Sequence, residues 1–219
     1  MSTTAITEAI KTLAEAERIF NLQRTEDEEF FLEWQTNLPN LSDAEKTELH
    51  QLRKRYLYQR SQSHLLEQTV MLLFASPLLA IAKGGCKQIA GFYDPPFQLR
   101  AEESVQINLA DSEEVLQGRI DVLVLSNQLW VVVLESKKTA ISVLSALPQT
   151  LAYLMANPQP TQPSFAMMTN GDDVLFVKLA LENNRKYALS RIFSAFVSNQ
   201  EIYSILQILK TISQGFDSK

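Results

Sequence analysis

The sequence predicts an α/β domain built on a mixed β-sheet that is flanked by helices. Residues 120–125 and 129–134 are two apolar runs, rich in β-branched side chains and separated by three polar residues. This pattern is typical of a β-hairpin whose strands are covered on both faces. Residues 97–102 and 105–109 alternate apolar with polar side chains, which predicts edge or half-exposed strand structure. We therefore expect an antiparallel β-meander at the centre of the chain.

The chain after this meander alternates between helix and strand patterns. Residues 139–157 predict a helix that ends before a proline, and residues 164–168 and 174–181 predict two strands joined by a turn that contains Asn-Gly. A crossover through the helix returns a strand parallel to the one before it, with right-handed sense. Residues 201–213 predict a final amphipathic helix. The expected sheet is therefore mixed.

The first third of the chain predicts helices. Residues 4–20 have apolar side chains at helical spacing, and capping-box patterns at Thr25–Glu28 and Ser42–Glu45 predict that two more helices begin there. The acidic side chains that follow Thr25 would favour the positive end of the helix dipole. We therefore expect an N-terminal helical extension over residues 1–60 and the main domain over residues 61–219.

Composition sets limits on location and partners. The 219 residues are 46% hydrophobic, carry a net charge of −5 and include one cysteine, so no internal disulfide is expected. The N-terminus lacks the pattern of a secretory signal, and the longest apolar run, residues 70–82, is too short to cross a bilayer. We expect a cytoplasmic protein with no membrane role. The basic residues at 53–55 and 60 are interpreted as a solvated helix face rather than a phosphate-binding footprint.

Three charged residues interrupt the apolar hairpin. Asp121 lies on the first strand, and Glu135 and Lys137 lie at the end of the second. Because side chains alternate along a strand, Glu135 and Lys137 project to one side and Ser136 to the other. Two carboxylates and an amine can therefore converge at one edge of the sheet. The alternative is an ordinary ion pair at a strand end.

Four segments together carry a family resemblance: Gly118-Arg119-Ile120-Asp121, Glu135-Ser136-Lys137, Gln149-Thr150-Leu151-Ala152-Tyr153 and Thr169-Asn170-Gly171. This pattern resembles the nuclease domain at the N-terminus of type I restriction enzyme motor subunits. That domain belongs to the restriction-endonuclease-like, or PD-(D/E)xK, superfamily. The resemblance spans about residues 60–180 and implies a restriction-endonuclease-like sheet over residues 61–219.

The resemblance implies a role for each charged residue of the hairpin. Asp121, Glu135 and the backbone carbonyl of Ser136 would hold Mg²⁺, for which Mn²⁺ would substitute. These are the hard oxygen ligands that Mg²⁺ prefers. The ammonium group of Lys137 would orient the attacking water and offset charge that develops on the phosphate. The side chains of Asp121, Glu135 and Lys137 are therefore predicted catalytic residues, together with Glu67.

Two helices are expected to support this site. Glu67, at the start of an apolar helix, matches an acid that many family members place beside the metal, although it also fits an exposed helix stripe. Gln149 and Tyr153, four residues apart on one helix face, would steady Lys137 or touch the DNA backbone. Their alternative is a hydrogen bond at the helix surface.

The resemblance implies a Mg²⁺-dependent DNA endonuclease, with two departures from the family pattern. Ile120 stands where the superfamily name has proline, and the chain contains no Gly-x-x-x-x-Gly-Lys-Ser/Thr loop for a translocase. We therefore expect a stand-alone relative that acts on DNA, as a homodimer or with a separate translocase or specificity subunit. Two alternatives remain: a nuclease fold used for DNA binding or assembly without turnover, and an unrelated interaction module.

Overall fold

The computed structural model describes residues 2–82, 92–93, 95–109, 114–126, 129–158, 161–181 and 185–215. For Ser2 and for residues 129–136 the description covers the backbone alone. The single cysteine, Cys86, and the predicted turn residues Asn127 and Gln128 lie outside the described part of the chain.

One mixed sheet runs through the described residues. Its strands are β1 (Ser2–Ala5), β2 (Gln23–Arg24), β3 (Phe97–Asn108), β4 (Glu114–Ser126), β5 (Leu129–Ser136), β6 (Ser164–Thr169), β7 (Asp173–Ala180), β8 (Lys186–Leu189) and β9 (Phe193–Ser194). The main order is β1-β4-β5-β6-β7-β8-β2, with β3 paired to β4 and β9 paired to β7. Because β4 has β1 and then β5 along one side, β3 follows its other side.

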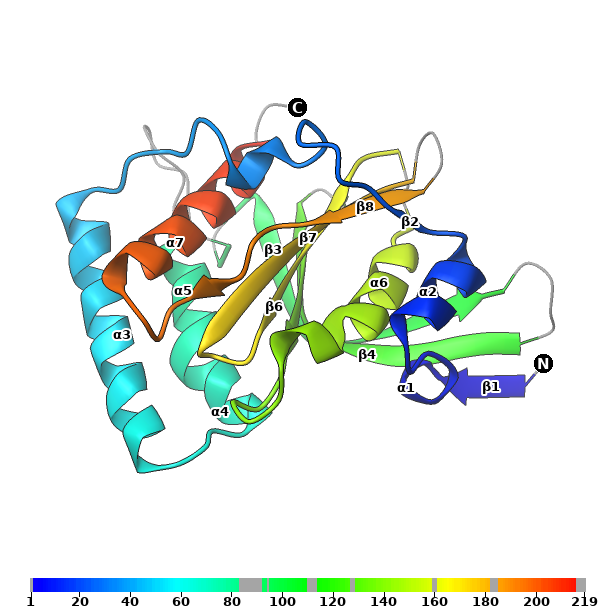
Figure 1. Ribbon diagram of the computed structural model, residues 1–219, viewed down its shortest axis with the longest axis horizontal. Helices are drawn as coiled ribbons and strands as arrows, with labels where there is room; N and C mark the ends of the chain where they lie inside the picture. The colour runs from blue at the N-terminus through cyan, green and yellow to red at the C-terminus, as the bar shows by residue number, and fades with distance from the viewer. Residues whose placement is uncertain are drawn as a thin grey trace.

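Helices cover both faces of this sheet (Figure 1). They are α1 (Ile6–Ala9), α2 (Leu13–Phe20), α3 (Asp43–Gln62), α4 (Glu67–Val70), α5 (Ser76–Ile81), α6 (Leu147–Met155) and α7 (Asn199–Gln214). Two short 3₁₀ helices, η1 (Leu32–Trp34) and η3 (Val143–Ala146), and one π-helical segment, η2 (Met71–Ala75), are also present. Among the described helices, none is both long and apolar enough to cross a membrane.

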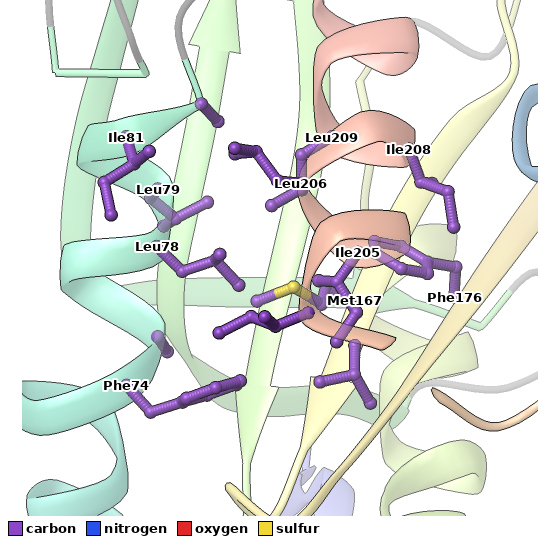
Figure 2. Packing of buried hydrophobic residues seen from close by; sticks show 14 of the residues in the cluster. Phe74, Leu78, Leu79, Ile81, Met167, Phe176, Ile205, Leu206, Ile208 and Leu209 are labelled. Carbon is purple, nitrogen blue, oxygen red and sulfur yellow. The ribbon is translucent and has the colours of Figure 1, made fainter. Parts of the chain in front are cut away.

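Two hydrophobic clusters fill the space between the sheet and its helices. On what we call the α7 face, side chains of α3, α5 and α7 pack against β6 and β7 through Met167 and Phe176 (Figure 2). On the opposite face, the α6 face, side chains of α2 and α6 pack against Ala166 and Leu175. Neighbouring residues of one strand thus belong to different clusters, as strand alternation requires. The sheet is buried on both sides.

The structure confirms the predicted fold class and its central connections. β4 and β5 pair antiparallel, and β5 pairs parallel with β6 after the crossover through η3 and α6. The helix predicted at Ser42 is α3, and both halves of its capping box form with Glu45. The long helix expected before the sheet is continuous from α4 through η2 to α5.

Two helix predictions near the N-terminus are wrong. Residues 4–20 are not one helix, because β1 and the short α1 precede α2, which begins at Leu13. The capping box predicted at Thr25 does not form. The Thr25 hydroxyl instead accepts a hydrogen bond from the Asp27 amide (3.2 Å), and the Asp27 carboxylate accepts one from the Glu29 amide (3.0 Å). Such short side-chain bonds to the backbone favour turns over a helix.

The N-terminal segment contributes to the main sheet. β1 pairs with β4 and β2 pairs with β8, both in parallel. The division of the chain at residue 60 stays a prediction, although the two halves share this sheet. Of the basic residues in α3, Arg53 donates to the carbonyls of Ala195 and Phe196, whereas Lys54 and Arg55 are exposed. The predicted solvated face is therefore confirmed for these two side chains.

Candidate nuclease site

An open pocket of about 460 Å³ lies between the β3–β4 hairpin and the helical segment that begins at α4. Among the described residues that line it, the charged ones are Glu67, Glu102, Arg119 and Asp121. Two of the predicted site residues, Glu67 and Asp121, therefore line one pocket although they are far apart in the sequence. The apolar wall includes Met71 and Leu72 from η2 and Leu99 and Val122 from the strands.

Asp121 lies at the position in β4 where the regular alternation of side chains between the two faces of the sheet is broken. Ile120 packs in the cluster on the α6 face, whereas Val122 packs in the cluster on the α7 face. Regular alternation would place both side chains on the same face. The neighbouring strand is also irregular here, because Glu102 has a left-handed backbone (φ 53°) between the pairs Ala101–Val122 and Glu103–Ile120. This change of face brings Asp121 to the wall of the pocket, beside α4.

A pair of hydrogen bonds fixes the start of α4 against the end of β5. The amide of Thr139 donates to the carbonyl of Leu65 (3.1 Å), and the amide of Leu65 donates to the hydroxyl of Thr139 (3.0 Å). Glu67 follows Leu65 by two residues, and Thr139 follows Lys137 by two residues. The bonds therefore hold the predicted helical acid close in space to the acid-x-lysine segment.

We expect Thr139→Val to destabilise the protein by about 1–3 kcal/mol, because a buried amide loses its acceptor. Thr139 is 8% exposed, so water does not easily replace the hydroxyl. Chemical denaturation of the two proteins gives the difference. Thr7→Val, at an exposed position of α1, is the matched control and should leave the unfolding free energy nearly unchanged. Equal values for both variants would contradict a fixing role for the Thr139 hydroxyl.

The acid-x-lysine segment forms the end of β5 and the residue after it. Val122 of β4 pairs with Leu134 of β5 in an antiparallel register. The next residue of β5, Glu135, therefore has its backbone near the preceding residue of β4, Asp121. Lys137 is partly exposed, and its amide donates to the carbonyl of Thr169 at 2.8 Å. The side chains of Glu135 and Ser136 lie outside the described part of the structure. Their predicted metal-binding roles therefore stay predictions.

The Thr-Asn-Gly turn after β6 supports this strand end. Besides the Thr169 carbonyl that holds Lys137, the Asn170 side chain donates to the carbonyl of Ile141 (2.8 Å) and accepts from the amide of Asp173 (2.8 Å). The Thr169 hydroxyl accepts from the amide of Gly171 (2.9 Å). These bonds give the turn a physical role: it fixes the chain at the predicted catalytic lysine and four residues after it.

Asp172, which the sequence did not single out, connects this turn to α3. Its carboxylate accepts hydrogen bonds from the Tyr56 hydroxyl (2.6 Å) and from Arg60 Nε (3.0 Å), and it pairs with the Arg60 guanidinium at 3.0 Å. Burial, and then the bond to Asp172, raise the pKa of Tyr56 well above its ordinary value, so the hydroxyl remains a donor. The pairing of Tyr56 and Arg60 with one later acid leaves no pattern in the sequence.

The predicted pair Gln149 and Tyr153 lies behind the sheet, on the α6 face. Tyr153 is 1% exposed, and its hydroxyl accepts a hydrogen bond from the Gln149 amide (2.5 Å). A Cβ atom on Gly118 would lie 2.6 Å from the Tyr153 ring, so the ring packs directly on the β4 backbone. The observed bond between the two side chains is the hydrogen bond named as their alternative role, and the roles predicted for them at the site stay predictions.

The donor set suits a hard divalent cation. Glu67 and Asp121 supply carboxylate oxygens to one open pocket, and such ligands are those that Mg²⁺ and Mn²⁺ accept. Among the described side chains, no three His, Cys, Asp or Glu residues are grouped closely enough to hold a metal ion. Glu135, the third predicted acid, is not among those side chains.

Comparison with known protein families agrees with this geometry. The family model for the type I restriction enzyme R protein N terminus matches residues 9–185, which is most of the chain. The chain belongs to this family. No curated protein and no solved structure matched the chain. The matched range of this R protein N-terminal domain contains every predicted site residue, from Glu67 to Tyr153, and it includes β2 and α2 as well as the central sheet.

Proposed function

We propose that this R protein N-terminal domain is a Mg²⁺-dependent DNA endonuclease. The observation that carries the proposal is the shared pocket of Glu67 and Asp121, at the point where β4 changes face. The Thr139–Leu65 bonds bring the same pocket close to the acid-x-lysine end of β5. Family membership supports a nuclease-related activity.

The residues of the site divide the work of phosphodiester hydrolysis. Asp121 and Glu135 would hold the metal with the carbonyl of Ser136, and Glu67 would bind one of its waters or the ion itself. The ion, when bound, neutralises phosphate charge and activates a water. Lys137 orients the attacking water and offers a positive charge to the phosphate as negative charge develops there. The Thr169 carbonyl fixes the Lys137 backbone, so the ammonium group starts from a defined position.

The assembly belongs to the same proposal. One site cuts one strand at a time, so cleavage of both strands is achieved by two chains related by a two-fold axis. The proposed partners are a translocase, which would move along DNA, and a specificity subunit, which would select the target; the printed sequence contains no nucleotide-binding loop of the translocase type. We place this activity in the cytoplasm, where its DNA substrate is.

The direct test is cleavage of supercoiled plasmid DNA by the purified chain. We expect nicked and then linear products in Mg²⁺ or Mn²⁺, and none in the presence of a chelator. Calorimetric titration with Mn²⁺ in the absence of DNA separates the remaining alternatives. Metal binding without cleavage would indicate a nuclease fold that serves binding or assembly, and absence of both would indicate an unrelated interaction module.

A further inference from the structure

The pocket wall carries one cation that the proposed chemistry has not used. Among the described residues that line the pocket, Arg119 is the only basic one, beside the acids Glu67, Glu102 and Asp121. These three carboxylates repel a polyanion such as DNA unless a nearby positive charge offsets the repulsion. Glu102 lies across from Asp121 in the β3–β4 register and is not one of the proposed metal ligands, so metal coordination does not remove its charge.

Arg119 is held only loosely. Its guanidinium lies 3.5 Å from the carboxylate of Glu102, and the two side chains are 65% and 64% exposed. They are not direct cross-strand partners, because Arg119 pairs with Ser104 in the β3–β4 register. Exposed ion pairs of this kind contribute little stability, so the arginine is available to another anion at low cost.

A second ion pair on the same hairpin provides a comparison. Arg100 and Glu103 of β3 approach to 2.9 Å, and both line a different pocket, which also contains Ala156 and Pro158 after α6. None of the described residues that line that pocket is a predicted catalytic residue. The hairpin therefore presents two arginine–glutamate pairs, of which one lies beside the candidate site and the other does not.

We propose that Arg119 binds a backbone phosphate of the DNA substrate, and that Glu102 forms an ion pair with the Arg119 guanidinium when DNA is absent. A planar guanidinium can donate two parallel hydrogen bonds to a phosphate. A carboxylate can accept the same two bonds, so Glu102 and a phosphate are alternative partners of Arg119. Arg119 is two residues before Asp121 on β4, so a phosphate bound there is adjacent to the one that the metal site would receive. This inference rests on the proposed function for the identity of the ligand.

DNA binding without turnover tests the inference. A fluorescent duplex is titrated with the full chain in Ca²⁺, and the dissociation constant is measured at several salt concentrations. We expect Arg119→Ala to weaken binding by about three- to tenfold and to lower the magnitude of the salt slope by about one. Arg100→Ala is the matched control and should leave both quantities near their original values. Equal effects of the two substitutions would overturn the proposal.

The role of Glu102 is tested by a double-mutant cycle. Glu102→Gln should strengthen DNA binding by about two- to threefold, because the arginine no longer has to leave a carboxylate. In the Arg119→Ala background the same change should give only the small gain that follows from the loss of one negative charge; the full gain there would overturn the pairing of Glu102 with Arg119. Glu103→Gln controls for the loss of one negative charge. Since binding is measured without cleavage, a chain that binds through Arg119 but does not cut would refute the endonuclease and leave this inference standing.

Discussion

Asp121→Ala and Lys137→Ala are each expected to abolish Mg²⁺-dependent DNA cleavage while leaving the fold intact. Asp121 contributes one of the three described carboxylates of the pocket and is a proposed metal ligand, so its loss weakens metal binding. The positive charge of Lys137 would stabilise the negative charge that develops on the phosphate in the transition state. Removal of such a group lowers the rate by about 10²–10³-fold. Initial rates of plasmid nicking at saturating Mg²⁺ measure both losses.

Two comparisons separate a chemical effect from a structural one. Asp121→Asn keeps the size of the side chain and removes its charge, so it should be as inactive as Asp121→Ala. Lys54→Ala removes an exposed lysine from α3 and should cut at the original rate. Circular dichroism and the denaturation midpoint should be nearly the same for all four proteins. Undiminished cutting by Asp121→Ala or Lys137→Ala would refute the assignment of these residues.

The parts of the fold that depend on local patterns were predictable. The apolar runs of β4 and β5 predicted two paired strands, and the capping box at Ser42 predicted the start of a helix. Both signals involve residues close together in the sequence, and both predictions are confirmed. The segment at Thr25 fits the same capping-box template, but its hydroxyl accepts a hydrogen bond from the Asp27 amide, two residues on, and a turn forms instead. β1 and β2 were missed because their stability comes from β4 and β8, partners distant in sequence.

The candidate site was predictable only in its residue types. The acid-x-lysine segment and the Gln-x-x-x-Tyr helix were recognisable from spacing, and Glu67 was recognisable as an acid on an apolar helix. The pairing of Asp172 with Tyr56 and Arg60 was not, because it joins separate elements through side chains that carry no local signal. The burial of Tyr153 on the α6 face likewise depends on its contact with Gly118, which only the fold creates.

Gly171→Ala is expected to be the most destabilising single change in the turn that holds Lys137. Gly171 has a left-handed backbone (φ 87°), and a Cβ atom there would lie 2.5 Å from the Tyr56 hydroxyl and 2.9 Å from its ring. The residue thus meets both a strained backbone and a collision with a fully buried tyrosine. Together these effects cost about 2–4 kcal/mol. Chemical denaturation measures the loss.

Gly215→Ala provides the matched control, because Gly215 has a right-handed backbone (φ −63°) and its nearest atom to an added Cβ is at an ordinary 3.5 Å. Alanine there should be neutral or stabilise the protein by about 0.4–1 kcal/mol. Gly171→Ala should also slow cleavage in conditions where it remains folded, since displacement of Tyr56 weakens its bond to Asp172 and loosens the Thr169 carbonyl that holds Lys137. A destabilised Gly171→Ala that cuts at the original rate would show that the turn supports the fold but not the lysine.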